Sequence, residues 1–212
     1  MNLFRFFGDM SHLASILILL YKIHATRSVR GLSFKTQALY VTVFVARYLD
    51  VFTEFVSVYN TLMKIFFISS SCFVLYLMKG RYRPTNDPSI DTFRVEYLLG
   101  PCALLALIFH YRWSFLEVLW SFSIFLESVA ILPQLFMLQR TGEAETITTH
   151  YLAALGAYRA LYIPNWIYRY WSEDVIDPIA VTAGIVQTAL YLDFFYVYFT
   201  KVLQGQKFEL PA

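Results

Sequence analysis

Four arginines lie inside or at the edge of apolar stretches of the chain, where a charged side chain is costly. They are Arg5, Arg47, Arg159 and Arg169. A guanidinium group is a planar fork of N–H donors that suits carboxylates, and such pairs are stronger away from water. A charge at the centre of a bilayer costs at least about 2.5 kcal/mol, so an intramembrane arginine indicates a functional site. The chemistry expected here is the capture of an anionic ligand.

Acidic side chains accompany these arginines. Asp50 lies three residues after Arg47, and Glu117 lies near Trp120 at the start of a later apolar stretch. A ligand with several carboxylates and one cation would satisfy the basic and the acidic groups together. A short acidic peptide that ends in a free carboxylate fits this description, and terminal carboxylates are a known recognition target.

One apolar stretch near residue 160 carries a polar face. Its members recur at steps of four, three and four, which places them on one side of a helix. They are Tyr158, Tyr162, Asn165 and Arg169. Arg159 and Trp166 flank this face, and Arg159 lies about 15 Å deeper than Arg169 because ten residues separate them. His12, in the first stretch, adds an imidazole that could act as a pH switch. These residues predict a polar cavity that opens at one end.

Structural interpretations of the same residues stay open. His12 could be a satisfied structural group, and the arginines could pair only with Glu117 and Glu127 to hold helices together. Lys64 is expected to snorkel or to pair structurally. Motifs of phosphate-binding loops, zinc proteases and serine hydrolases are not found in the sequence. We therefore expect neither an enzyme nor a bound metal or cofactor, and no nucleic-acid partner.

The composition is that of a membrane protein. Of the 212 residues, 58% are hydrophobic and 15% are charged, with a mean hydropathy of +0.52, whereas soluble domains carry about 25% charged residues. A transmembrane helix needs about 20 mostly apolar residues. Seven windows approach this length, namely 2–21, 36–53, 55–78, 95–110, 114–138, 147–168 and 179–200. We predict a single all-α integral membrane domain over 1–212, with membrane lipid around it.

The basic residues predict the orientation. Eleven of them follow the first, third, fifth or seventh window, whereas only Arg112 and Arg169 lie on the other side. The eleven are Lys22, Arg27, Arg30, Lys35, Lys79, Arg81, Arg83, Arg94, Arg140, Lys201 and Lys207. Because positive residues favour the cytosolic side, we expect a lumenal N-terminus and a cytosolic C-terminus.

A weak internal repeat divides the chain further. Residues 33–37 and 46–49 resemble residues 145–149 and 158–161, at a constant offset of 112. Three-helix repeats separated by one linker helix would be parallel to each other. The expected layout is a first bundle over about 1–78, a linker helix over about 95–110, a second bundle over about 114–200, and a short cytosolic tail over 201–212.

Several long runs are similar to a known family. They are Phe4–Arg5, Gly8–Leu13, Arg47–Asp50, Leu126–Leu135, Thr141–Tyr151, Tyr158–Tyr162 and Asp193–Tyr196. Through these runs the chain resembles the KDEL receptors, the ER lumen protein-retaining receptors, along essentially its whole length. Leu132-Pro133-Gln134 also resembles the PQ-loop signature of the SWEET-like fold. Loop and lipid-facing positions look like those of a fungal-type member.

The resemblance implies a receptor for escaped ER residents. It would bind their C-terminal Lys/His-Asp-Glu-Leu signals in the acidic Golgi, return them in COPI vesicles and release them in the ER at near-neutral pH. The ligand-binding residues implied are Arg5, Arg47, Tyr48, Asp50, Glu117, Trp120, Tyr162, Asn165, Trp166 and Arg169. A proton-sensitive lock is implied at His12, Glu127, Tyr158 and Arg159. The trafficking residues implied are Asp193, Lys201 and Lys207.

Within that set the resemblance implies individual roles. Arg47, helped by Tyr48, would take the terminal carboxylate of the signal. Arg5 would pair with its glutamate, and Arg169 with its aspartate. Asp50 would belong to the acidic wall that receives the leading lysine or histidine.

The tail departs from the family pattern, and other functions remain to be weighed. Family members often end with several closely spaced lysines, whereas this chain has only Lys201 and Lys207, with Gln204 and Gln206 between them. A small-solute transporter on the same helical plan is the main alternative to a receptor. It is disfavoured because polar groups become rare in the cytosolic halves of the windows. A seven-helix signalling receptor is disfavoured by the short connections.

Overall fold

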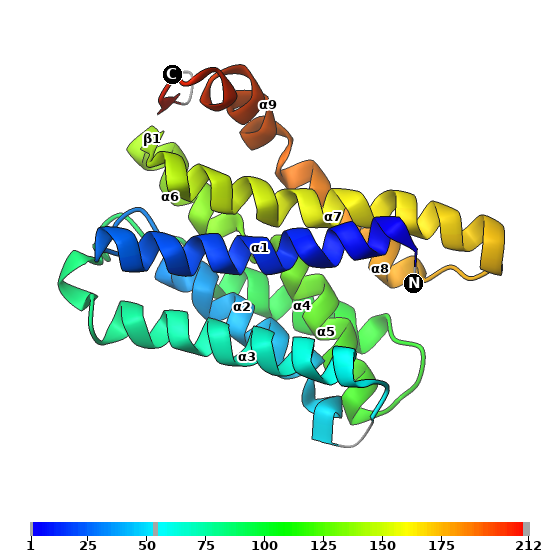
Figure 1. Ribbon diagram of the computed structural model, residues 1–212. Helices are drawn as coiled ribbons and strands as arrows, with labels where there is room; N and C mark the ends of the chain where they lie inside the picture. The colour runs from blue at the N-terminus through cyan, green and yellow to red at the C-terminus, as the bar shows by residue number, and fades with distance from the viewer. Residues whose placement is uncertain (1, 53–54, 210–212) are drawn as a thin grey trace.

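The computed structural model describes residues 2–52 and 55–209, which form a bundle of helices (Figure 1). The α-helices are α1 (Leu3–Thr26), α2 (Phe34–Arg47), α3 (Val58–Lys79), α4 (Glu96–Ile108), α5 (Phe115–Val129), α6 (Leu132–Thr141), α7 (Thr146–Glu173), α8 (Pro178–Leu190) and α9 (Leu192–Thr200). Short 3-10 turns are η1 (Leu49–Phe52), η2 (Arg83–Thr85) and η3 (Val202–Gln204). Two-residue strands β1 (Glu143–Ala144) and β2 (Phe208–Glu209) pair antiparallel.

Polar residues placed just before apolar runs start many of these helices. The side chains of Asn2, Ser33, Ser57, Ser114 and Asp177 each accept a hydrogen bond from a backbone N–H in the first turn. Such caps satisfy donors that an isolated helix end leaves unpaired. The sequence therefore sets the starts of α1, α2, α3, α5 and α8 locally.

The apolar windows of the sequence correspond to helical segments. Among the residues that the structure describes, three segments are long and apolar enough to cross a membrane, namely Leu3–Thr26, Val58–Lys79 and Phe115–Thr141. A fourth would be Pro178–Leu190 together with Leu192–Gln204, which are bent by 44° at their junction. The prediction of an all-α integral membrane protein is confirmed at this level.

The other windows meet that test less well, for physical reasons. Helix α2 has 14 residues and α4 has 13, so each is about 20 Å long and shorter than a hydrocarbon core of about 30 Å. Helix α7 has 28 residues, but Arg159, Asn165 and Arg169 lower its hydropathy. A bundle that buries this polar face can tolerate it, because the charged groups then face protein rather than lipid.

Packing brings together segments that are distant in the chain. Helix α1 lies along α7, and α2 packs on both α3 and α5 (Figure 1). Helix α4 packs mainly on α5, and α8 lies between α5 and α7. Gly8 allows the close approach of α1 to α7, since a Cβ there would lie 2.8 Å from the Tyr162 ring. Gly184 plays the same role in α8, beneath Trp166.

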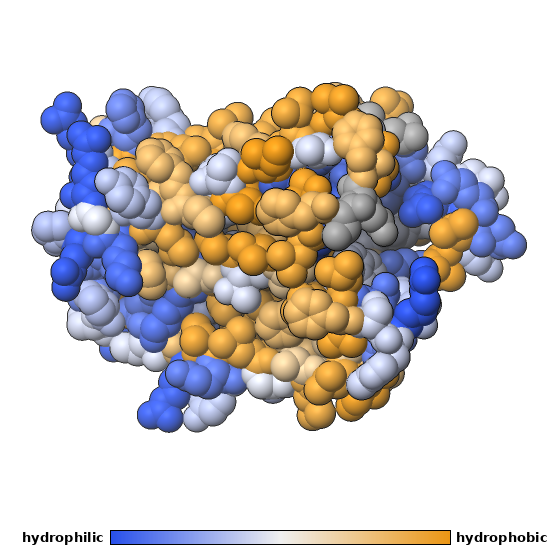
Figure 2. Space-filling view, turned by 90° about the horizontal axis from the view of Figure 1, so that it is seen from below, coloured by the Kyte–Doolittle hydropathy of each residue, from blue (hydrophilic) through white to orange (hydrophobic). Residues whose placement is uncertain are grey.

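The surface has the pattern expected of a protein embedded in lipid. Figure 2 shows a hydrophobic band across the middle of one face, between hydrophilic groups at the two ends. Large apolar side chains are exposed along α3 and α4, including Leu62, Ile65, Leu104 and Leu107. So large an apolar surface on a soluble monomer would be a liability, whereas lipid covers it at no cost.

The segment expected to be a short tail over 201–212 is folded as far as the structure describes it. Val202 and Phe208 are buried, and the Phe208 ring lies 5.5 Å from that of Phe194 in α9. Strand β2 pairs with β1, in the connection between α6 and α7. Met1 and residues 210–212 lie outside the described residues.

Candidate functional site

Three charged side chains meet in the interior of the bundle. The Glu127 carboxylate, in α5, is fully buried, and its Oε2 lies 2.5 Å from Arg47 Nη1 and 2.5 Å from Arg159 Nη2. The Tyr158 hydroxyl donates to Glu127 Oε1 and accepts from Arg159 Nη2 at 2.7 Å. Two guanidinium groups thus share one carboxylate, which leaves the ion cluster with one net positive charge.

The two arginines occupy equivalent positions in the internal repeat. Helix α2 begins at Phe34 and ends at Arg47, whereas α7 begins at Thr146 and contains Arg159. Both the helix starts and the arginines are therefore 112 positions apart. The sequence similarity thus marks two side chains, on α2 and α7, that converge on a single carboxylate.

Arg47 has further partners that the sequence did not indicate. Its Nε donates to Ser123 Oγ and its Nη2 to the Ser123 carbonyl oxygen, both at 3.1 Å. The Ser123 hydroxyl in turn donates to the Trp120 carbonyl oxygen at 2.6 Å. Ser123 precedes Glu127 by four residues and so shares its helix face. That spacing was the only available signal for its role.

His12 lies against this cluster. Its ring stacks on the Tyr158 ring at 4.2 Å between centroids and 8° between planes, and on Phe67 at 4.5 Å. Phe44 closes a third side at 5.7 Å, and only 7% of His12 is exposed. Because the Tyr158 hydroxyl is bonded to Glu127, a change of charge on His12 would act directly on the cluster.

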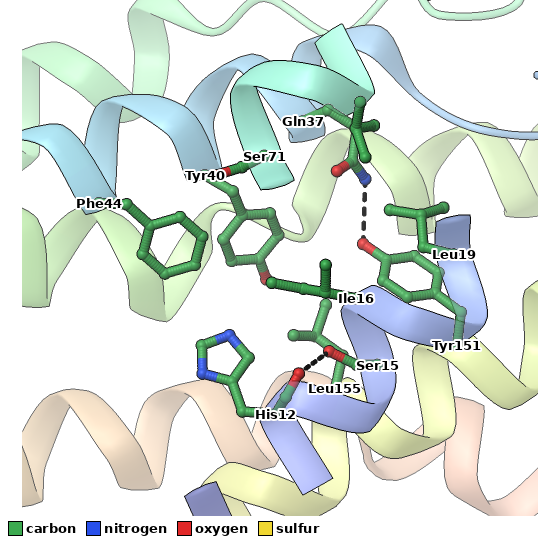
Figure 3. A pocket seen from close by; sticks show the side chains of 11 residues that line it. His12, Ser15, Ile16, Leu19, Gln37, Tyr40, Phe44, Ser71, Tyr151 and Leu155 are labelled. Carbon is green, nitrogen blue, oxygen red and sulfur yellow. Dashed lines mark hydrogen bonds between the residues drawn. The ribbon is translucent and has the colours of Figure 1, made fainter. Parts of the chain in front are cut away.

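A small cavity lies beside His12, as Figure 3 shows. It is lined mostly by apolar groups of α1, α2, α3 and α7, and its volume is about 20 Å³. Farther along it, Gln37 Nε2 donates to the Tyr151 hydroxyl at 3.0 Å. A cavity of this size holds about one water molecule. The cavity beside His12 is therefore too small to be a ligand site by itself.

The next layer of the site joins α1 to α7. Arg5 Nε lies 4.0 Å from Asp9 Oδ2, and the Tyr162 hydroxyl donates to Asp9 Oδ1 at 2.5 Å. Asn165, which is buried, accepts from Asn2 Nδ2 at 2.8 Å. The sequence did not indicate Asn2 as a partner of this face. Polar groups of α1 and its N-cap thus contact the polar face predicted for α7.

Trp166 completes this face of α7. Its ring meets that of Tyr162 edge-on at 5.9 Å. The guanidinium carbon of Arg159 lies 4.8 Å from the Tyr158 ring centre and 5.8 Å from that of Tyr162. The predicted helix face is therefore continuous, with aromatic rings supporting the deeper arginine.

The outermost charges are paired within the protein. Arg169 Nε donates to Glu173 Oε2 at 2.8 Å, and both side chains are partly exposed. Lys64 Nζ lies 2.6 Å from Asp50 Oδ2, so the expected structural pairing of Lys64 is confirmed. Asp50 therefore already has a cation of this chain beside it.

Two predicted ligand contacts, Glu117 and Trp120, lie nearer the start of α5 than Glu127 does. Both are partly buried in the first turns of α5, and Trp120 lies 6.2 Å from the Tyr111 ring. Tyr48, by contrast, follows Arg47 directly and stacks on Phe44 at 6.0 Å. The structure thus places Tyr48 next to Arg47, and Glu117 and Trp120 in the first turns of α5.

Comparison with known proteins identifies the chain. The family model described as "ER lumen protein retaining receptor" matches residues 28–169. The ER lumen protein-retaining receptor of Drosophila melanogaster is 58% identical over 212 residues, which is 100% of both chains. ER lumen protein-retaining receptor 2 of Gallus gallus and that of Homo sapiens show the same identity and coverage. The chain belongs to the ER lumen protein retaining receptor family.

Membership of this receptor family confirms the resemblance seen in the sequence, and the family is one of receptors rather than enzymes. The matched region contains Arg47, Glu127, Arg159 and Arg169, and the full-length relatives extend the match over Arg5 and His12. These relatives are animal proteins, so the fungal-type character of this ER lumen protein retaining receptor stays a prediction.

The residues expected to serve trafficking lie in and after α9, near the C-terminus of the chain. Asp193 is exposed in the first turn of α9, beside the bend that separates α8 from α9. Lys201 follows α9, and Lys207 is exposed just before β2. His150 Nδ1 and the Tyr198 hydroxyl, 2.8 Å apart, tie α9 to the first turns of α7. Arg169 lies at the opposite end of α7.

Proposed function

We propose that the chain is a retrieval receptor that binds the C-terminal Lys/His-Asp-Glu-Leu signals of escaped ER lumenal proteins. It would bind them at acidic pH in the Golgi, return them to the ER by COPI transport and release them at neutral pH. Family membership supports the receptor role. The observation that carries the choice of ligand is the buried Arg47–Glu127–Arg159 cluster, whose excess positive charge favours a carboxylate.

Binding at this site is an exchange of carboxylates. Every arginine of the proposed site already has an acidic neighbour, so an incoming peptide must compete with the protein's own acids. The C-terminal carboxylate would compete with Glu127 for Arg47, and the signal's glutamate with Asp9 for Arg5. Its aspartate would compete with Glu173 for Arg169. Such competition makes binding weaker than contacts alone would suggest.

His12 would supply the pH dependence. Imidazole in water titrates at about pH 6.5, so a change from acidic to neutral pH alters its charge. The charged and titratable groups that face it are Glu127, Arg47, Arg159 and Tyr158. A proton on His12 adds positive charge to a cluster that receives a carboxylate from the ligand. By linkage, peptide binding is then accompanied by proton uptake.

We further propose seven membrane crossings in two parallel three-helix repeats, over about 1–78 and 114–200, with α4 as the linker helix. The contacts support a two-fold relation between the repeats. Helices α1 and α5 begin 112 positions apart, as do α2 and α7. Consistent with that relation, α1 packs on α7 while α5 packs on α2.

The N-terminus would then be lumenal and the C-terminus cytosolic. Lys201 and Lys207 would face the COPI coat from the cytosolic end, and the bend beside Asp193 would couple them to ligand binding. The orientation is tested with two variants, one with a single cysteine at position 3 and one with a single cysteine at position 207. Each cysteine is labelled in intact microsomes. Only the second should react with a reagent that cannot cross the membrane.

Peptide binding tests the function. A peptide ending in His-Asp-Glu-Leu should bind the purified protein more tightly at pH ~5.5 than at pH ~7.2, values on either side of the reference histidine pKa. The same peptide with an amidated C-terminus should bind far more weakly at both. Equal binding of the free and amidated peptides would contradict the proposal, and uptake of a small solute into liposomes would favour a transporter instead.

A further inference from the structure

A long apolar groove runs beside α4 and takes no part in the site described above. One wall comes from α4 and its C-cap, between Tyr97 and Phe109, and the other from α8 between Pro178 and Val186; its floor includes Val129 of α5. The groove has a volume of about 540 Å³, within the range of about 300–1,000 Å³ typical of ligand sites. It is therefore large enough for a ligand rather than for solvent alone.

The lining of the groove selects hydrocarbon. Ser128 is one of its few polar residues, and its hydroxyl already donates to the Phe125 carbonyl oxygen at 2.7 Å. Leu105 and Val186 are 38% and 44% exposed, so the groove is open on its side rather than sealed. An apolar groove that opens sideways on a membrane helix is accessible to a lipid acyl chain.

Basic side chains gather where α4 begins, at one end of this groove. Arg94 is exposed two residues before α4. Lys35 Nζ donates to the Phe93 carbonyl oxygen at 2.7 Å, and Arg140 Nη1 donates to Thr92 Oγ1 at 2.7 Å. Residues 92–94 therefore carry one cationic side chain, Arg94, and are contacted by two more, Lys35 and Arg140.

The acids nearby do not cancel this charge. Asp91 is buried, and its two oxygens accept from Ser33 Oγ at 2.9 Å and from the Lys35 backbone N–H at 3.1 Å. Glu96 lies in the first turn of α4. Positive charge thus remains in excess at the base of an apolar groove, which is the arrangement that an anionic amphiphile requires.

We propose that an anionic glycerophospholipid binds here, with an acyl chain along the groove and its phosphate among Arg94, Lys35 and Arg140. The start of α4 is at the end proposed above to face the cytosol, where the leaflet is rich in anionic lipids. The lipid would brace α4, which packs mainly on α5 and is too short to span the hydrocarbon core alone. The inference depends on the proposed orientation for the source of the lipid and not on peptide binding.

Purified receptor in detergent micelles allows a direct test. Native mass spectrometry and thermal unfolding are measured with added phosphatidylserine, phosphatidylcholine, cholesterol or soluble phosphoserine. Phosphatidylserine should remain bound and raise Tm, phosphatidylcholine should do so much less, and phosphoserine should have no effect because it lacks the acyl chain. Retrieval-peptide binding, measured in parallel, reports on the proposed function independently.

Two pairs of variants locate the lipid. Arg94→Gln should weaken phosphatidylserine binding about fivefold, from about one basic contact, whereas Arg81→Gln, on the loop after α3, should not. Leu105→Trp should fill the groove and displace the acyl chain, whereas Leu107→Trp, an exposed leucine of α4 outside the lining, should not. All four side chains are exposed, so the variants should fold.

Three results would overturn the proposal. Equal stabilisation by phosphatidylcholine would mean that charge plays no part, and preferential binding of cholesterol would assign the groove to a sterol. Unchanged phosphatidylserine binding in both Arg94→Gln and Leu105→Trp would place the lipid elsewhere on the surface.

Discussion

The inner and outer ion pairs of the candidate site are built from the same residue types but behave differently. Glu127 is 0% exposed and holds two guanidinium groups, whereas Arg169 and Glu173 are 37% and 49% exposed and form an isolated pair. Removing one partner of a buried pair typically costs about 3–5 kcal/mol. An exposed pair contributes about 0–1 kcal/mol.

This difference separates the tasks within one site. The outer pairs can open at little cost, so Arg5 and Arg169 are available to the side chains of an incoming peptide. The inner cluster resists exchange, and any ligand that reaches Arg47 must offer an anion as good as Glu127. We infer that the outer layer governs encounter and the inner layer governs selectivity and pH dependence.

The largest effect should come from neutralising the shared carboxylate. Glu127→Gln would leave Arg47 and Arg159 buried without a counter-ion, which should destabilise the fold by about 3–5 kcal/mol. Thermal unfolding in detergent measures the change. Glu117→Gln, on the same helix but away from the cluster, is the control and should change Tm little. A Glu127→Gln protein as stable as the wild type would mean that the inner cluster is as replaceable as the outer pairs.

Removing Arg47 should abolish most peptide affinity. Because Arg47→Gln deletes the proposed partner of the terminal carboxylate, binding should weaken by about 2–5 kcal/mol, or about thirtyfold or more. Isothermal titration calorimetry at pH ~5.5 measures this, and Arg140→Gln serves as a basic-residue control at the opposite end of the bundle.

A comparison with amidated peptide makes the Arg47 test specific. Amidation should weaken binding to the wild type strongly and to Arg47→Gln hardly at all, since the two changes remove the same contact. If both proteins lost equal affinity on amidation, another group would be holding the carboxylate.

His12→Phe should remove the pH dependence while keeping the ring stack with Tyr158 and Phe67. One coupled proton can change affinity by at most about tenfold per pH unit. We therefore expect the affinity at pH ~5.5 to fall to the level found at pH ~7.2. Fluorescence anisotropy of a labelled peptide across this range is the measurement. A variant that still prefers acidic pH would move the switch to another group.

Much of the fold and part of the site could be predicted from the sequence. The apolar windows and the caps Ser33 and Ser114 are local signals, and the spacing of Tyr158, Tyr162 and Asn165 defined the polar face of α7 correctly. Which acidic side chain pairs with which arginine was not predictable from the sequence, because that depends on how helices distant in sequence pack. Glu127 was one of two candidate partners for the arginines, and nothing local showed that it would hold both.

The same limit explains what the sequence missed. The contacts of Ser123 with Arg47 and of Asn2 with Asn165 depend on where α5 and α1 meet their neighbours. The packing of Phe208 against Phe194 depends on the return of the chain beside α9. Serine, asparagine and phenylalanine at such positions have no pattern that separates a partner from a bystander.

The smallest effect is expected at the outermost ion pair, Arg169–Glu173. Here the substitution should strengthen peptide binding, whereas Arg47→Gln should weaken it. Glu173→Gln should change stability by less than about 1 kcal/mol, because the pair with Arg169 is solvated. It should also tighten binding of a His-Asp-Glu-Leu peptide by up to about fivefold, since the internal competitor for Arg169 is gone. The gain should shrink as salt is raised, because exposed charges are screened, and it should vanish for a peptide with asparagine in place of aspartate. A large loss of affinity would instead make Glu173 a positioning residue for Arg169, and the outer pair would then be as necessary to binding as the inner cluster.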